Sequence, residues 1–233
     1  MKLAIMQPYL FPYIGYFQLI NAVDRFVVLD DVNHIKRGWV NRNRILVNGE
    51  PHMFTMPLKD ASQNRLICEI ALSPEAVAWR NSFLRTLEFN YRKASEFATV
   101  YPLLREIVMF DTGSMVDYIV NTLRRLCGWL GIETEMVWSS RGYEKQGYAG
   151  QERILDICRR EKTDRYINPI GGVEIYDKEL FARHGIRLNF LKSGDISYQQ
   201  FDGEFVPWLS IIDVMMFNPV PAIRNLLEQY TLV

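Results

Sequence analysis

Two short, continuously apolar segments near the start of the chain constrain its fold more than any other feature. Residues 3–6 (LAIM) end at Gln7, and residues 26–29 (FVVL) end at Asp30 and Asp31. Neither segment alternates apolar with polar side chains, which is typical of strands covered on both faces. The sequence therefore predicts an α/β fold with a mainly parallel sheet flanked by helices.

The ends of these strands also predict where a site lies. In open α/β sheets the ligand crevice lies beyond the carboxyl ends of the strands. Residues 33–44 follow the second strand and are rich in amide and cationic side chains. We therefore expect one pocket to be formed by Gln7, Asp30, Asp31, Lys36, Asn41 and Asn43.

A β-hairpin is predicted directly after this segment. Residues 44–47 and 53–56 are two β-like runs separated by a stretch that contains Asn48-Gly49. Asn-Gly is the strongest short hairpin signal, because both central residues of a type I′ turn need a positive φ. Residues 66–72 are predicted to form a further strand.

Residues 73–131 are predicted to be mostly helical. The clearest helix opens at Ser114, with Asp117 three residues on to complete a cap, and ends at Gly131. Strands then alternate with helices again, which favours parallel pairing. The predicted strands are 136–138, 166–169 and 186–191, and the predicted helices are 151–160, one around 180–181, 208–217 and 221–230. We expect a single domain over residues 1–233, with a helical insert at about 73–131.

Composition narrows the class of protein. The 233 residues carry a formal net charge of zero, so no overall field gathers nucleic acid and general nucleic-acid binding is not expected. No apolar stretch reaches the roughly 18 residues that a membrane span needs, and no cleavable leader pattern is present, which predicts a cytoplasmic protein. The three cysteines are odd in number and have no CxxC spacing, so we expect core residues rather than disulfides or a zinc site at Cys68, Cys127 and Cys158.

Common catalytic and nucleotide-binding motifs are absent: there is no P-loop, GxGxxG, GxSxG or HExxH. Gly171-Gly172 either lets the backbone approach a phosphate closely or forms a plain turn. Asp213 lies in an apolar run, where an unpaired charge is costly, so we expect it to bind a buried donor.

Several motifs together resemble those of the WbqC-like family. They are residues 6–20 (MQPYLFPYIGYFQLI), 30–32 (DDV), 36–45 (KRGWVNRNRI), 152–155 (ERIL), 166–172 (YINPIGG) with Tyr176, 185–186 (GI) and 209–213 (LSIID). The resemblance extends over nearly the whole chain. It implies an association with the biosynthesis of bacterial O-antigen, part of lipopolysaccharide, and a role in attaching glycine or another acyl group to an amino sugar.

Acyl transfer to a sugar amine needs a neutral amine, an acceptor for its proton and donors for the oxyanion of the tetrahedral intermediate. The catalytic candidates are the acids, amides and lysine of the motifs, namely Asp31, Asp30, Lys36, Asn41 and Asn43. The substrate-binding candidates are Gln7, Tyr9, Trp39, Arg42, Arg44, Gly171 and Gly172.

Specific roles follow from residue type. Asp31 is the preferred acid or base, whereas Asp30 is better placed to tie down the strand end. Arg42 or Arg44 suits bidentate pairing with a nucleotide diphosphate, and Trp39 suits stacking on a base or sugar. The same residues have structural alternatives: a turn cap, a solvated cationic face and core aromatics.

Three functions remain open from the sequence. The first is an acyl (aminoacyl or formyl) transferase that acts on a nucleotide-linked amino sugar by direct transfer, since no covalent nucleophile is evident. The second is another sugar-nucleotide enzyme that uses Asp30 and Asp31 as paired carboxylates, and the third is a non-catalytic binding or scaffold protein of glycan assembly. The expected partners are a nucleotide-linked sugar and an acyl or aminoacyl carrier. No residue set demands a metal, and the sequence does not identify the acyl donor.

Overall fold

The central element of the structure is a six-stranded sheet in the order β10-β9-β8-β1-β2-β7. The computed structural model describes residues 1–233. All neighbouring strands pair in parallel except β10, which is antiparallel to β9. The strands are β1 (Lys2–Met6), β2 (Arg25–Val28), β7 (Glu135–Val137), β8 (Arg165–Pro169), β9 (Arg187–Ser193) and β10 (Tyr230–Leu232). The predicted α/β class with a mainly parallel sheet is confirmed.

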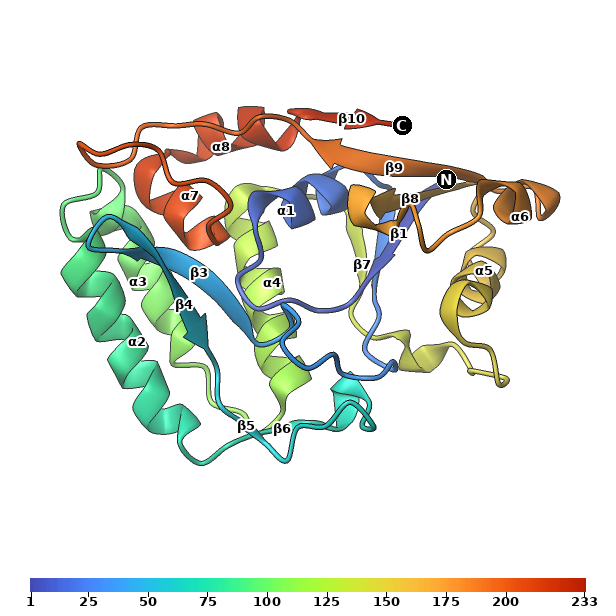
Figure 1. Cartoon of the computed structure of the whole chain (residues 1–233), viewed down its shortest axis with the longest axis horizontal. Helices are drawn as coiled ribbons and strands as arrows, with labels where there is room; N and C mark the ends of the chain where they lie inside the picture. Colours follow the sequence, from blue (N-terminus) through green and yellow to red (C-terminus); the bar gives the residue numbers. More distant parts are fainter.

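Helices cover both faces of this sheet (Figure 1). Ala4 and Val28 point to the face that packs with α1 (Ile14–Asn21), α4 (Met115–Leu130) and α8 (Val220–Leu227). Leu3, Ile5 and Val27 point to the other face, which α5 (Gly150–Arg160) and α6 (Lys178–Arg183) cover. Neighbouring residues of one strand are thus buried on opposite faces, which explains why the strands are continuously apolar.

The strand order reverses between β1 and β8. From β1 the chain passes through α1 to β2 on one side, whereas from β8 it passes through α6 to β9 on the other. The two connecting helices lie on opposite faces of the sheet. The carboxyl ends of β1 and β8 therefore diverge around a topological switch point, where open α/β sheets bind ligands.

Small strands and three long helices are inserted between β2 and β7. The hairpin of β3 (Arg42–Val47) and β4 (Glu50–Thr55) turns at Asn48 and Gly49, whose φ values of 52° and 82° are those of the predicted turn. After β5 (Leu58–Lys59) and β6 (Ala71–Leu72) come the predicted helices: α2 (Ala76–Tyr91), α3 (Phe97–Val108) and α4. Ser114 caps α4 by accepting from the Asp117 backbone N–H at 3.2 Å.

Two predicted elements differ from the structure. Residues 66–72 form a 3₁₀ turn at Ile67–Glu69 before the short β6, because the Glu69 carboxylate accepts from the Leu66 backbone N–H at 3.0 Å and closes the chain on itself. The last helix ends at Leu227, and the chain then returns to the sheet as β10. The helix predicted over 208–217 is α7 (Ile211–Phe217).

The predicted buried donors of Asp213 are present. Its fully buried carboxylate accepts from the Tyr91 hydroxyl at 2.8 Å, and from the Tyr198 hydroxyl and the Gln200 amide at 2.7 Å each. Burial raises the pKa of this carboxyl although the three donors oppose the shift. The cluster ties α7 and the segment before it to α2.

The three cysteines differ in their burial. Cys127 and Cys158 are buried as predicted, whereas Cys68 is half-buried, and none forms a disulfide.

None of the helices combines the length and the apolar character needed to cross a membrane.

Candidate functional site

A cavity of about 360 Å³ opens at the switch point. Its floor comes from the ends of three parallel strands and from the start of α1, and its walls come from the Trp39 loop, β3 and the segment before α7. The lining residues are Met6, Tyr9, Pro12, Tyr13, Gly15, Tyr16, Trp39, Asn43, Arg44, Pro169, Ile170, Leu191, Ser193 and Trp208. The volume lies within the range of about 300–1,000 Å³ that is usual for small-molecule sites.

Arg44 is the only cationic side chain that lines the cavity, and five of the other lining residues are aromatic. Its guanidinium carbon lies 5.8 Å from the centre of the Trp39 ring, and its Nη2 donates to the Trp208 carbonyl at 3.2 Å. The Arg44 Nε is buried without a hydrogen-bond partner in the protein, and the Ser193 hydroxyl lies beside the Tyr13 phenol. Burial raises the pKa of the Tyr9 and Tyr13 phenols, so both stay neutral. The cavity thus combines one fixed positive charge with several stacking surfaces.

Asn43 fixes the shape of the cavity rather than offering a free amide. Its Nδ2 donates to the Phe11 carbonyl at 2.8 Å, and its Oδ1 accepts from the Arg44 backbone N–H at 2.9 Å. Phe11 has a φ of 42°, a conformation that is uncommon for a bulky residue. The amide therefore holds the first turn of the motif against β3.

Asp30 and Asp31 belong to a separate buried cluster at the ends of β2 and β7. Asp30 accepts from the Ser140 backbone N–H at 2.9 Å and from the Ser139 hydroxyl at 2.8 Å. The Asp31 carboxylate pairs with Arg153 at 2.7 Å, and the Ser140 hydroxyl lies within hydrogen-bond distance of both acids. Arg153 is 1% exposed. Both carboxylates are thus satisfied by protein groups.

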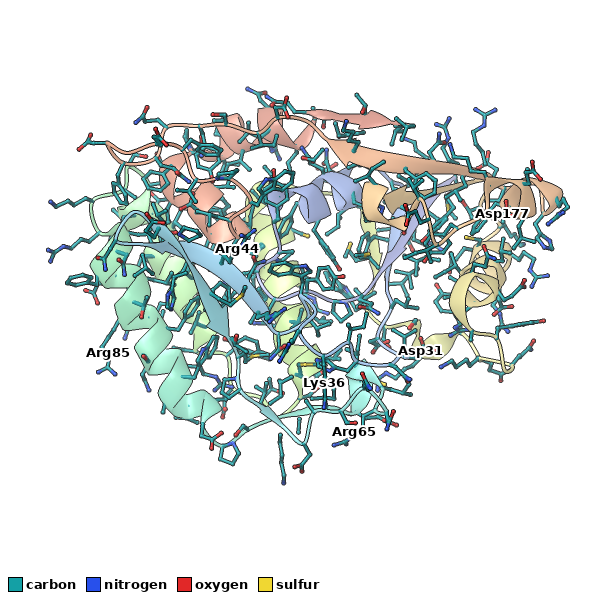
Figure 2. All side chains as sticks on the ribbon, viewed as in Figure 1. Asp31, Lys36, Arg44, Arg65, Arg85 and Asp177 are labelled. Carbon is teal, nitrogen blue, oxygen red and sulfur yellow. The ribbon has the colours of Figure 1, made fainter.

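The structure therefore brings together only part of the predicted site. Tyr9, Trp39, Asn43 and Arg44 line the cavity. The expected convergence on one pocket does not extend to the other candidates, which lie outside it: Gln7, Asp30, Asp31, Lys36, Asn41, Arg42, Gly171 and Gly172. Figure 2 shows Asp31 and Lys36 well apart from Arg44. Lys36 lies outside the cavity because the chain after β2 first runs away from it and contributes to its wall only from Trp39 onward.

Several of the outlying candidates have structural partners of their own. Asn41 Nδ2 donates to the Met56 carbonyl at 2.8 Å, and Arg42 Nε donates to the Gly38 carbonyl at 2.9 Å. A Cβ atom at Gly172 would lie 1.8 Å from the Asn168 Nδ2, so a close approach to a protein side chain, and not to a phosphate, explains that glycine. The same Cβ at Gly171 would meet open space.

Sequence reasoning missed two groups on the cavity wall. Ser193 ends β9, and the rule that ligands lie at the carboxyl ends of parallel strands could have identified it. Trp208 is the first residue of the helix predicted over 208–217, but the helix begins only at Ile211, and no motif marked Trp208 as a site residue.

His34 is buried, and neither ring nitrogen has a hydrogen-bond partner. Burial lowers its pKa from the usual 6.5. The unfolded chain therefore takes up a proton at His34 at a higher pH than the folded chain does. The stability that the neutral imidazole contributes is complete above the unfolded pKa and is lost as the pH falls from there through the lower folded pKa.

We expect the free energy of unfolding of the wild type, relative to that of His34→Leu, to decrease when the pH is lowered from 7.5 to 5.5. Urea denaturation at the two pH values measures this difference. The matched control is His52→Gln, which changes an exposed histidine on β4 and should follow the wild type. A pH-independent difference between wild type and His34→Leu would show that His34 titrates alike in both states.

The comparison with known proteins gives the family. Residues 7–225 match the WbqC-like protein family. The chain belongs to this family. A Mycobacterium tuberculosis (strain ATCC 25618 / H37Rv) protein named Uncharacterized protein Rv1507c is 30% identical over 220 residues, which is 93% of each chain. No solved structure matches this WbqC-like protein.

Proposed function

We propose that this WbqC-like protein is a transferase that attaches an acyl group, aminoacyl or formyl, to a nucleotide-linked amino sugar in bacterial surface-polysaccharide (O-antigen) biosynthesis. The observation that carries the proposal is the cavity at the switch point, with Arg44 among aromatic rings. A nucleoside diphosphate sugar offers matching chemistry, because its phosphates need a cation and its base needs a stacking surface.

The polar residues of the lining support the same ligand class. Arg44 and Ser193 both line the cavity, and the buried Arg44 Nε has no hydrogen-bond partner in the protein. Phosphate and sugar oxygens are acceptors that these groups suit. The acceptor sugar would then occupy the β9 side of the cavity, beside Ser193.

The lining residues favour catalysis by positioning. No carboxylate or imidazole lines the cavity. A neutral sugar amine can attack the carbonyl carbon of an activated acyl donor directly, forming the C–N bond as the bond to the leaving oxygen or sulfur breaks. The proton released by the amine nitrogen then passes to the leaving group. Holding the two reactants in line supplies much of the rate enhancement in such reactions.

The alternative of a paired-carboxylate enzyme has less support. Such enzymes hold two acids on opposite sides of the reacting bond, whereas Asp30 and Asp31 share the Ser140 hydroxyl on one side. A flat apolar surface would favour a scaffold protein, and the aromatic cavity with its single cation does not resemble one.

Binding of nucleotide sugars tests the proposal. UDP-, dTDP- and GDP-linked amino sugars are compared by thermal shift, because a ligand that binds only the folded state stabilises it by about 2.7 kcal/mol at 100 times its Kd. The sugar that binds is then incubated with acyl donors, and mass spectrometry detects the acylated amine. The proposal is wrong if no nucleotide sugar raises the unfolding midpoint.

Arg44 should contribute binding rather than chemistry. Arg44→Ala removes a charge-assisted hydrogen bond worth about 1.5–3 kcal/mol, so KM should rise by about 10- to 150-fold while kcat changes little. The matched control is Arg85→Ala, which removes an exposed arginine on α2, far from Arg44 (Figure 2). A large fall in kcat at unchanged KM would contradict the assignment.

A further inference from the structure

Trp208 combines an unusual backbone with an exposed ring. Its φ is 61°, and 58% of the residue is exposed. L-residues rarely adopt this left-handed region, and a bulky side chain there is an outlier, whereas glycine adopts it freely. Residues held in such conformations cluster at ligand-binding sites.

The surrounding backbone fixes this conformation. The Trp208 carbonyl accepts from Arg44 Nη2 at 3.2 Å. Two residues later, the Ser210 backbone N–H donates to the Arg44 carbonyl at 2.8 Å, and the Ser210 hydroxyl donates to the Phe11 carbonyl at 2.7 Å. The segment is thus anchored to two walls of the cavity, and none of these bonds uses the indole ring.

The ring itself lies on the cavity. It packs against Tyr13 with the ring centres 5.1 Å apart. Trp39, which is 40% exposed, lines the same cavity. Arg44 contacts both tryptophan residues, the ring of Trp39 and the carbonyl of Trp208. Two indoles with free surface therefore adjoin the one cation of the cavity.

We propose that Trp208 stacks on the base of the nucleotide while Arg44 holds the diphosphate, an inference that rests on the proposed function. In a nucleoside diphosphate the planar base lies one ribose away from the phosphates, which matches an exposed indole beside a guanidinium. Every base offers a π-face, so an aromatic ring can stack on a purine or a pyrimidine alike. The amino sugar, which needs polar partners, then lies toward Ser193.

Calorimetry with UDP, GDP and pyrophosphate tests this assignment. Removing the ring by Trp208→Ala or Trp208→Gly should weaken UDP and GDP binding by about 5- to 150-fold, the loss expected for one base–aromatic stack. Trp208→Phe, which keeps a ring, should lose much less, and pyrophosphate, which has no base, should bind all variants equally. Trp138→Ala is the matched control. The Trp138 ring centre lies 4.8 Å from the Arg124 guanidinium carbon, so this tryptophan also adjoins an arginine, but it does not line the cavity.

The two truncations separate the ring from the backbone. Glycine relieves the left-handed conformation and alanine does not, so the Tm of Trp208→Gly should exceed that of Trp208→Ala by about 2–4 °C. Their nucleotide affinities should nevertheless be equally low. The inference is overturned if both variants bind UDP as tightly as the wild type, or if pyrophosphate binding falls as much as UDP binding. If the wild type binds no nucleotide, the proposed function fails as well.

Discussion

Replacing Arg153 with methionine should lower the free energy of unfolding by about 3–5 kcal/mol, because it leaves a buried carboxylate without its partner. Arg153 is almost completely buried and donates to Asp31 at 2.7 Å, to the Ser140 carbonyl at 3.2 Å and to the Tyr143 carbonyl at 2.6 Å. Urea denaturation followed by circular dichroism measures the change as a lower midpoint at constant slope.

Two variants make the Arg153 result specific. Arg159→Met changes an exposed arginine of the same helix and should stay within about 0.5 kcal/mol of the wild type. The double variant Arg153→Met/Asp31→Leu removes both charges and should recover part of the loss. Equal losses for Arg153→Met and Arg159→Met would contradict the importance of the buried pair.

Asp31→Asn decides between the two roles of that residue. The acid–base role predicted from the sequence requires a folded variant whose turnover is about 10²- to 10⁴-fold lower. The ion pair with Arg153 instead predicts a loss of stability with turnover retained in the folded fraction. Measuring midpoint and turnover on one sample separates these outcomes, and Asp30→Asn, which disturbs the hydrogen bonds to Ser139 and Ser140, should chiefly lower the midpoint.

Asp213→Ala should lower the free energy of unfolding by about 3 kcal/mol or more, because the buried Tyr91 and Gln200 and the half-buried Tyr198 lose their acceptor and each lost acceptor costs about 1–3 kcal/mol. Tyr198→Phe removes a single donor of the same cluster and should cost about 1 kcal/mol. Chemical denaturation of both variants measures the difference. Equal effects would mean that Tyr91 and Gln200 find other partners when the carboxylate is lost.

The sequence predicted the fold well where a pattern repeats locally. The continuous apolar runs of β1 and β2, the Asn48-Gly49 turn and the Ser114 cap each follow from neighbouring residues, and each is present. The prediction failed over residues 66–72, where one side chain, Glu69, competes with the strand for a backbone N–H. It also missed β10, whose pairing depends on β9 rather than on its own three residues.

The site was predicted only as far as the strand ends identify it. Tyr9 and Arg44 line the cavity because the motifs adjoin β1 and β3. Asp30 and Asp31 also follow a parallel strand, yet they face the serines after β7 and the guanidinium of α5, which a one-dimensional pattern does not reveal. Reasoning from strand ends pointed to the edge of the sheet where the cavity opens, and it did not reveal which side chains are paired with other protein groups.

The position of β1 between β2 and β8 has a consequence for how the chain reaches its fold. Leu3 pairs with Arg25 on one side and with Tyr166 on the other. The pairing of β1 with β2 can therefore form early, whereas its pairing with β8 requires contacts between residues more than 150 positions apart in the sequence. Contacts of such long sequence separation slow folding, and until they form β1 presents an open edge to other molecules. Aggregation during refolding should therefore compete with completion of the sheet, and low protein concentration and low temperature should favour the folded product.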